Sequence, residues 1–147
     1  MARILLVEDD PGILALFEQV LLLAGYDVDT GETFQTANDL LASGEYDLLV
    51  TDGRLPGGTG MALAYKAKEK GIVTLIVTGF LHSFNRGNPG IEDHYTILQK
   101  PLTPKDLLAA ISAAIGCAVS LTNRPKPHMP HGMTQVSWVD MIATDRE

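Results

Sequence analysis

The sequence predicts an α/β protein built on a parallel sheet of five strands, with helices on both faces. Two observations lead to this prediction. Short apolar runs alternate with segments of helical period along residues 1–116. The runs at 3–7 and 47–51 are also continuously apolar, which is typical of parallel strands covered on both faces. Right-handed crossovers between such strands place helices on both sides of the sheet.

The first two helices are indicated by residues suited to their ends. Asp10 can cap a helix with Pro11 in its first turn, where a missing N–H costs nothing. Gly25 stands where that helix needs a left-handed cap. Residues 26–30 alternate in polarity and predict an exposed edge strand. A second helix is expected over 33–43.

The second half repeats the alternation, with one irregular stretch. A helix is expected over 60–70, a strand over 72–77, and a last helix from Thr103-Pro104 to a stop at Gly116. Residues 79–95 have the length of a helix but contain glycines and a proline near their centre. These residues weaken or break helices, so we expect a short, frayed or mobile helix there.

The end of the chain differs in composition. We expect the main domain to end at residue 116 and residues 117–147 to form a Pro-rich linker and a short tail. This tail is too short for an independent effector domain.

Bulk properties exclude several classes of protein. The net charge of −7 argues against binding to nucleic acid or to an anionic membrane surface. The single cysteine excludes an internal disulfide and suits a reducing compartment. No apolar run approaches the roughly 20 residues of a membrane-spanning helix. We therefore expect a cytoplasmic protein.

Polar side chains follow the predicted strands at the points where the strands end. Asp52 follows the apolar run 48–51, Glu8 and Asp9 follow 4–7, and Thr78 follows 72–77. The carboxyl ends of parallel strands meet at one edge of a sheet, where ligands of open α/β sheets bind. The sequence therefore predicts a site at this edge.

The residue types in this site suit phosphoryl transfer. Asp52 can act as a carboxylate nucleophile that forms an acyl phosphate. Glu8 and Asp9 offer oxygen ligands for Mg2+, which proteins commonly hold by one or two carboxylates. Lys100 places an ammonium group at the end of the last strand, and Thr78 offers a hydroxyl to a phosphoryl oxygen.

Residues 1–116 resemble the receiver domain of bacterial two-component response regulators. The motifs that support the resemblance are Leu5-Leu6-Val7-Glu8-Asp9-Asp10-Pro11, Asp52 with Leu55-Pro56-Gly57 just after it, Val77-Thr78-Gly79, and Lys100-Pro101. The resemblance implies a flavodoxin-like fold with strand order 2-1-3-4-5. It also implies that a histidine kinase or a histidine phosphotransfer protein phosphorylates Asp52, and that the domain signals through a downstream protein partner. A homodimer is left open. Such a domain is not an enzyme beyond its own phosphorylation and dephosphorylation.

The resemblance also implies roles for single residues. By analogy, Asp9 binds Mg2+ directly, Glu8 binds it through water, and Asp52 and the backbone carbonyl of Arg54 complete the protein ligands. Thr78 and Lys100 would contact the phosphoryl group, and the peptide bond between Lys100 and Pro101 is expected to be cis.

The sequence departs from the family pattern mainly between Thr78 and Lys100. Many receivers have an aromatic switch residue three positions before the lysine, where this sequence has Ile97. Either Tyr95 or Phe80 could take its place. Glu8 stands where many members have aspartate, and its extra methylene still permits a role through water. These departures suggest an atypical output face.

Two alternative functions remain. The first is a pseudo-receiver, a binding module that is not phosphorylated; the intact set of site residues argues against it, and Ile97 favours it. The second is a Mg2+-dependent phosphatase of another α/β family that forms an aspartyl phosphate. Those enzymes have an Asp-x-Asp pattern, and here Arg54 replaces the second aspartate. The glycines at 57–60 are interpreted as a tight turn, since no Gly-Lys-Ser/Thr follows them.

Overall fold

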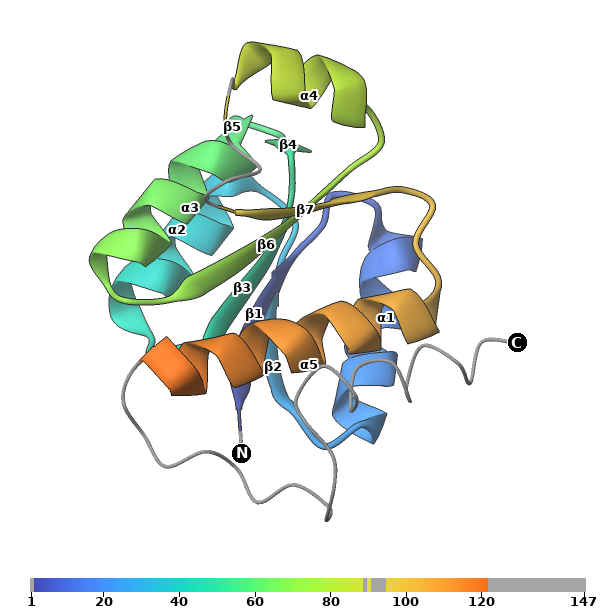
Figure 1. Cartoon of the computed structure of the whole chain (residues 1–147), viewed down its shortest axis with the longest axis vertical. Helices are drawn as coiled ribbons and strands as arrows, with labels where there is room; N and C mark the ends of the chain where they lie inside the picture. The colour runs from blue at the N-terminus through green and yellow to red at the C-terminus, as the bar shows by residue number, and fades with distance from the viewer. Residues whose placement is uncertain (1, 89, 91–94, 122–147) are drawn as a thin grey trace. The chain divides into compact units, whose positions relative to one another are not determined.

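The computed structural model describes residues 2–88, 90 and 95–121. The chain divides into two compact units, Met1–Pro101 and Leu102–Glu147. The first unit is built on a five-stranded sheet with the order β2-β1-β3-β6-β7, in which every pairing is parallel. Its strands are β1 (Arg3–Val7), β2 (Asp27–Gly31), β3 (Leu48–Asp52), β6 (Val73–Thr78) and β7 (Thr96–Gln99). In sequence order this is 2-1-3-4-5, so the predicted fold class and strand order are confirmed (Figure 1).

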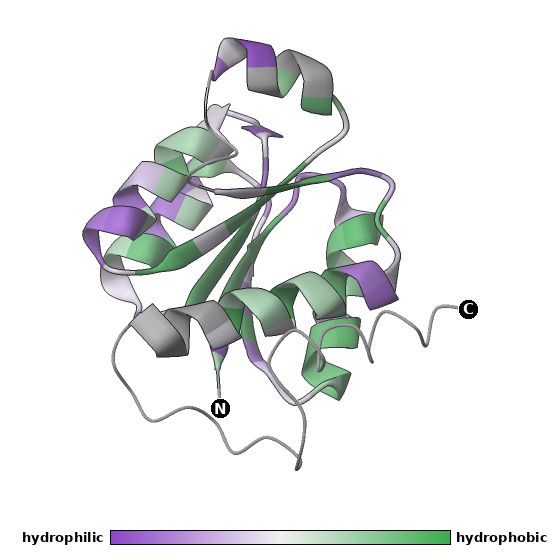
Figure 2. Cartoon of the chain, in the orientation of Figure 1, coloured by the Kyte–Doolittle hydropathy of each residue, from purple (hydrophilic) through white to green (hydrophobic). Residues whose placement is uncertain are grey.

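The centre of the sheet is apolar, as its continuous hydrophobic runs predict. Every residue of β3 is buried, and β1 is buried after Arg3. Figure 2 shows these central strands as the hydrophobic layer of the unit. β2 is only half-buried and lies at the edge of the sheet, which confirms the edge strand expected from its alternating polarity.

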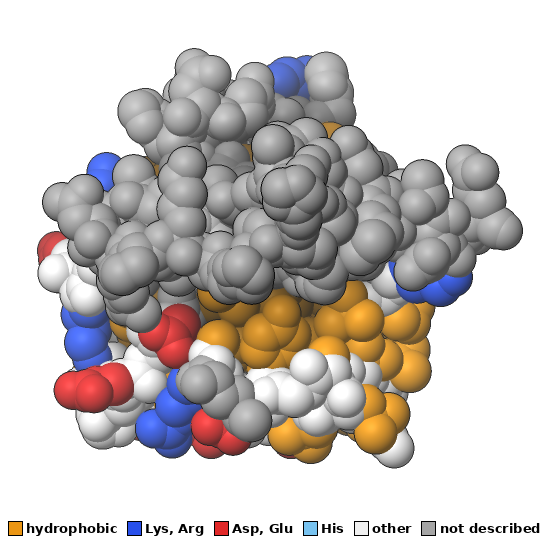
Figure 3. Space-filling view, turned by 60° about the horizontal axis from the view of Figure 1, so that its bottom comes forward, with side chains coloured by type: hydrophobic (Ala, Val, Ile, Leu, Met, Phe, Trp, Pro, Cys, Tyr) orange, Lys and Arg blue, Asp and Glu red, His pale blue; other side chains and the backbone are white. Residues whose placement is uncertain are grey.

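Helix α1 (Pro11–Leu23) covers one face of the sheet beside β1 and β2. It begins as predicted, because Asp10 Oδ1 accepts hydrogen bonds from the backbone N–H groups of Gly12 and Ile13 at 2.8 and 3.1 Å. One stripe of the helix is buried through Leu14, Phe17 and Leu21. Leucines elsewhere on the helix are exposed, and Figure 3 shows hydrophobic side chains on the face that includes the end of α1.

The opposite face is covered by α2 (Phe34–Ser43) and α3 (Gly60–Glu69). Each helix begins after a threonine whose hydroxyl accepts a backbone N–H bond, Thr33 for α2 and Thr59 for α3. The core on this face joins both helices to β1 and β3. Its fully buried members include Leu5, Ala37, Leu41, Leu49, Leu63 and Ala67.

Two short elements lie beyond the ends of the strands. A hairpin of two-residue strands, β4 (Arg54–Leu55) and β5 (Gly58–Thr59), forms in the stretch that the sequence analysis interpreted as a tight turn. The turn itself lies between these strands, where Gly57 has a φ of 87°. Helix α4 (Leu81–Gly87) has only seven residues, which confirms a short helix within 79–95. Residues 89 and 91–94 lie outside the described part of the chain.

The second unit contains α5 (Pro104–Leu121). Its start agrees with the prediction, because the Thr103 hydroxyl accepts a bond from the backbone N–H of Asp106 at 3.1 Å. Its predicted end at Gly116 is wrong, since the helix continues to Leu121. One glycine inside a helix costs about 1 kcal/mol. This is too little to end a helix that has Ala113, Ala114 and Ala118 within three residues of the glycine. Residues 122–147, which hold the predicted linker and tail, lie outside the described residues, and the boundary at 116 stays a prediction. Within the described residues, no helix has the length and apolarity needed to cross a membrane.

A small polar network joins the starts of the strands. The buried Tyr46 donates a hydrogen bond from its hydroxyl to Asp29 Oδ2 at 2.7 Å. Arg3 donates to the same oxygen at 2.8 Å, and its guanidinium lies 5.3 Å from the centre of the Tyr46 ring. Burial, followed by the hydrogen bond to Asp29, raises the pKa of Tyr46 to about 12. The protonated hydroxyl is therefore the form that the folded protein favours.

We predict that Tyr46→Phe lowers the free energy of unfolding by about 1 kcal/mol at neutral pH, because it removes this hydrogen bond. A raised pKa contributes stability that is fully present below pH 10 and is lost as the pH rises through about 12. The variant should therefore lose less stability than the wild type on that rise. Urea unfolding at several alkaline pH values measures both effects. Tyr65→Phe, on a side chain that is 55% exposed, is the control and should match the wild type. Identical pH profiles for wild type and Tyr46→Phe would refute the prediction.

Candidate functional site

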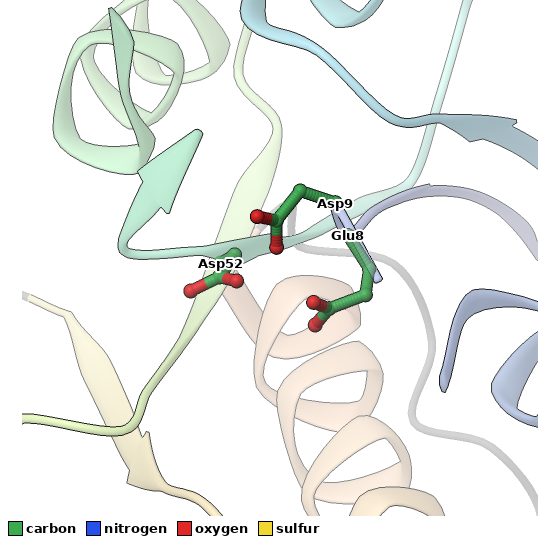
Figure 4. Close-up of side chains that lie close together, drawn as sticks. All are labelled: Glu8, Asp9 and Asp52. Atoms are coloured by element: carbon green, nitrogen blue, oxygen red, sulfur yellow. The ribbon is translucent and has the colours of Figure 1, made fainter. Parts of the chain in front are cut away.

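The sheet brings three carboxylates together at the carboxyl ends of its strands. Glu8 and Asp9 follow β1, and Asp52 ends β3, which is the neighbour of β1 in the sheet. Each offers a carboxylate oxygen, and these atoms all lie within 4.8 Å of one another. Figure 4 shows the three side chains converging on one point. Asp10 is not part of this group; its side chain caps α1, as the sequence analysis expected.

Lys100 brings a positive charge to the same point from the end of β7. Its Nζ donates to Glu8 Oε2 at 2.7 Å and to Asp52 Oδ2 at 3.0 Å. The side chains of Glu8 and Asp52 are nearly buried, at 4% and 13% exposed, whereas the side chain of Lys100 is 22% exposed. The peptide bond between Lys100 and Pro101 is cis, as the resemblance implied.

The three carboxylates carry more negative charge than the single ammonium group of Lys100 can neutralise. Burial raises the pKa of Glu8 to about 7, and the charge of Asp52 adds to that effect against the hydrogen bond from Lys100. Burial alone would lower the pKa of Lys100, but its bonds to Glu8 and Asp52 outweigh burial and raise it. A further positive charge at this point would relieve the repulsion between the carboxylates.

The donor set fits a hard divalent cation. Three carboxylate oxygens within a few ångströms are the type of ligand that Mg2+ takes. Glu8, Asp9 and Asp52 are the residues that would hold the ion. The described structure thus places all three predicted carboxylate ligands together, while the roles of these residues stay predictions.

Thr78 and Arg54 lie beside the carboxylates. Thr78 ends β6, is buried, and accepts a bond on Oγ1 from the backbone N–H of Phe80 at 3.1 Å. It lies close to Gly53, where an added Cβ would be 3.3 Å from the threonine hydroxyl. Arg54 pairs with Thr59 in the hairpin, so its backbone is fixed two residues after Asp52, while its side chain is exposed.

The end of β7 is tied to the end of β6 through the backbone. The backbone N–H of Lys100 donates to the carbonyl of Thr78 at 2.8 Å. This bond fixes where the Lys100 side chain begins, and therefore allows its ammonium group to reach across β6 to β3 and β1. Thr78 and Lys100, predicted as partners in one site, are neighbours in the structure.

Gly60 is a residue whose part in the site the sequence analysis missed. It lies against the backbone of Asp52, where a Cβ would come within 2.2 Å of the Asp52 carbonyl oxygen. Its N–H also donates to the carbonyl of Gly53 at 3.0 Å. The only signal in the sequence was a run of glycines, which a tight turn also explains.

The segment after Thr78 borders a cleft of about 210 Å3 beside the site. Its lining includes Gly53, Arg54 and Thr78 from the site, together with Phe80, Phe84 and Asn88 from the segment after Thr78. Of the two candidates for the aromatic switch, Phe80 is 68% exposed. Tyr95 instead packs with Ile97 against a cluster of Met61, Ala64 and Ile76. Which of the two responds to a change at Asp52 stays a prediction.

Comparison with known proteins gives a consistent result. The family model for the response regulator receiver domain matches residues 4–112. The chain is 32% identical over 116 residues to the protein PetR of Rhodobacter capsulatus, covering 77% of this chain and 48% of PetR. It is 29% identical over 119 residues to the phosphate regulon transcriptional regulatory protein PhoB of Pseudomonas aeruginosa, covering 76% of this chain and 51% of PhoB. The chain thus spans about half the length of the curated relatives that it matches.

Solved structures show the same likeness. A CheY-like response regulator receiver domain protein from Methanospirillum hungatei aligns with a TM-score of 0.74 and 27% identity, covering 82% of this chain and 98% of that one. The response regulator protein TrrA from Thermotoga maritima, solved in complex with Mg2+-BeF, aligns with a TM-score of 0.65 and 29% identity, covering 76% and 96%.

We predict that Gly60→Ala destabilises the protein by about 2 kcal/mol or more, because its methyl group would require the backbone at Asp52 to shift. Thermal or urea unfolding measures the loss. Gly79→Ala is the matched control, since a Cβ there meets nothing within 4 Å, and it should leave the unfolding free energy nearly unchanged. An equal effect of both substitutions would contradict the proposed contact.

Proposed function

Because the chain belongs to the family of response regulator receiver domains, we propose that it accepts a phosphoryl group on Asp52 in a phosphorelay signal transduction system. The observation that supports this most directly is the Lys100 ammonium group between Glu8 and Asp52, at 2.7 and 3.0 Å. A lysine bonded to the proposed acceptor is placed to stabilise the charge that develops on a phosphoryl group during transfer.

The proposed reaction moves a phosphoryl group from a phosphohistidine to Asp52. A carboxylate oxygen of Asp52 attacks phosphorus, the bond between phosphorus and the imidazole nitrogen breaks, and an acyl phosphate forms. Lys100 neutralises a phosphoryl oxygen, and the Thr78 hydroxyl donates a hydrogen bond to another. When bound to Glu8, Asp9, Asp52 and the Arg54 carbonyl, Mg2+ would supply positive charge to the transferring group.

The donor would be a histidine kinase or a histidine phosphotransfer protein, and the output a contact with another protein. The match covers 48% of PetR and 51% of PhoB, and PhoB is a transcriptional regulatory protein. We propose signalling in the cytoplasm through protein contacts of the receiver itself, without turnover of a small substrate.

We predict that a small acyl phosphate with Mg2+ adds one phosphoryl group to the wild type and none to Asp52→Asn, which keeps the shape of the side chain but lacks the nucleophile. Intact mass measurement reads out the label. Asp27→Asn, a substitution on the exposed start of β2, is the control and should label like the wild type. Equal Mg2+-dependent labelling of Asp52→Asn would place the acceptor elsewhere.

We also predict that Mg2+ raises the melting temperature of the wild type, since an ion that binds only the folded protein stabilises it. The shift should be several-fold smaller in Asp9→Asn, which removes one negative ligand. Asp10→Asn is the matched control, because asparagine also caps helices and Asp10 is outside the carboxylate group. A full Mg2+ shift in Asp9→Asn would remove this residue from the proposed metal site.

A further inference from the structure

The cleft of about 210 Å3 beside the site lies between helix α4 and the hairpin of β4 and β5 (Figure 1). All its described lining residues belong to the first compact unit. Drug-sized ligands occupy pockets of about 300 Å3 or more, so this cleft is too small for a nucleotide or another ligand with several rings. A cavity of about 150 Å3, in contrast, already holds benzene. The cleft therefore has room for one aromatic ring with a small substituent.

One part of the lining is apolar and suits such a ring. Phe80, Phe84 and Met61 supply two phenyl rings and a thioether. Phe84 packs against the buried cluster that contains Met61, which holds these two walls together. Phe80 is 68% exposed, so a ligand in the cleft would remove part of its ring from water. Phenyl rings and thioethers both make favourable contacts with a further aromatic ring.

The charge of the lining is positive. Arg54 is the only charged residue among the described lining residues, although the chain has a net charge of −7. Its side chain is exposed and forms no ion pair with a described residue. The nearby carboxylates of Glu8 and Asp52 bond instead to Lys100. An unpaired guanidinium group binds a carboxylate through two parallel hydrogen bonds, so the charge of the cleft favours a carboxylate ligand.

Two polar side chains of the lining have bonding capacity left for a ligand. Asn88 donates from Nδ2 to the Phe84 carbonyl at 3.0 Å, which leaves its Oδ1 as an acceptor. Thr59 accepts a bond on Oγ1 from the backbone N–H of Ala62 at 3.2 Å, which leaves its hydroxyl hydrogen as a donor. Apolar walls with a few polar groups that fix orientation are the usual composition of a small-molecule site.

We propose that the cleft binds a small aromatic carboxylate, which consists of a single ring with one carboxylate group. The ring contacts Phe80, Phe84 and Met61, and the carboxylate pairs with Arg54. Because Phe80 and Arg54 are exposed and the ligand is small, binding is weak, with a dissociation constant on the order of 1 mM for the simplest such acid.

Titration of the full chain with benzoate, followed by two-dimensional NMR of the backbone amide groups, tests the proposal. No Mg2+ and no phosphodonor are present, so the result does not depend on the proposed function. The amide signals of Gly53, Phe80 and Asn88, which line the cleft, should shift with a dissociation constant on the order of 1 mM. Those of Gly25 and Gly71, which precede β2 and β6 at the opposite edge of the sheet, should not move.

Two related compounds separate the contribution of the ring from that of the charge. Acetate has the carboxylate without the ring, and benzyl alcohol has the ring without the charge. Each should bind at least about tenfold more weakly than benzoate. Equal binding of acetate would show that the chain holds benzoate only as an anion, and equal binding of benzyl alcohol would exclude the pairing with Arg54; either result overturns the proposal.

Substitutions in the cleft provide a second test. Arg54→Gln and Phe80→Ala should each weaken benzoate binding at least about fivefold, because they remove the charge and one aromatic wall. Both side chains are exposed, so the variants should stay folded, with the remaining amide signals unchanged. Lys68→Gln and Tyr65→Ala are the matched controls on exposed residues of α3 outside the described lining, and they should bind like the wild type. Absence of shifts at the cleft in the wild type, or equal weakening by Arg54→Gln and Lys68→Gln, would overturn the proposal.

Discussion

The contact on which the site depends is the bridge from the Lys100 ammonium group to Glu8 and Asp52. Two carboxylates about 4 Å apart repel each other by about 4 kcal/mol at the effective dielectric near a protein surface, and these two are largely buried. Lys100 reaches both because β7 lies beside β6 and its backbone N–H is bonded to the Thr78 carbonyl. The chain distance from Glu8 to Lys100 is 92 residues, so only the order of strands in the sheet brings them together.

Asp52 is also held in place by backbone contacts. Asp52 lies at the end of a fully buried strand, and Gly60 packs against its carbonyl oxygen. The hairpin between them is anchored to α2, where the Phe34 N–H donates to the Pro56 carbonyl at 3.0 Å and the Phe34 ring lies where a Cβ on Gly58 would be. These contacts leave Asp52 little freedom to move, and they also restrict the backbone at Arg54. Phosphoryl transfer to the proposed acceptor would require such a rigid side chain with fixed neighbours.

The sequence predicts those parts of the fold that depend on local pattern. The strands ending at Val7 and Asp52 were identifiable because they are continuously apolar, and α1 because Asp10 caps it. The hairpin at 54–59 was not, because two-residue strands have no alternation and their position depends on Phe34, which is distant in sequence. The role of Gly60 depends on its distance to the Asp52 carbonyl, which no spacing encodes. Helix α5 continues beyond Gly116 because the free-energy cost of a single glycine is too small to end a helix.

The contacts around Thr78 connect the proposed acceptor site to the aromatic residues that follow β6. Thr78 and Ile76 belong to the same strand, and Ile76 packs in the cluster that Tyr95 and Ile97 contact. The aliphatic side chain of Ile97 packs against this cluster. The Tyr95 ring, in addition, contacts the half-exposed ring of Tyr65 edge to face, with ring centres 6.5 Å apart. Phe80 is linked to the site more directly, because its backbone N–H donates a hydrogen bond to the Thr78 hydroxyl. A shift of that hydroxyl would therefore act first on the backbone of Phe80.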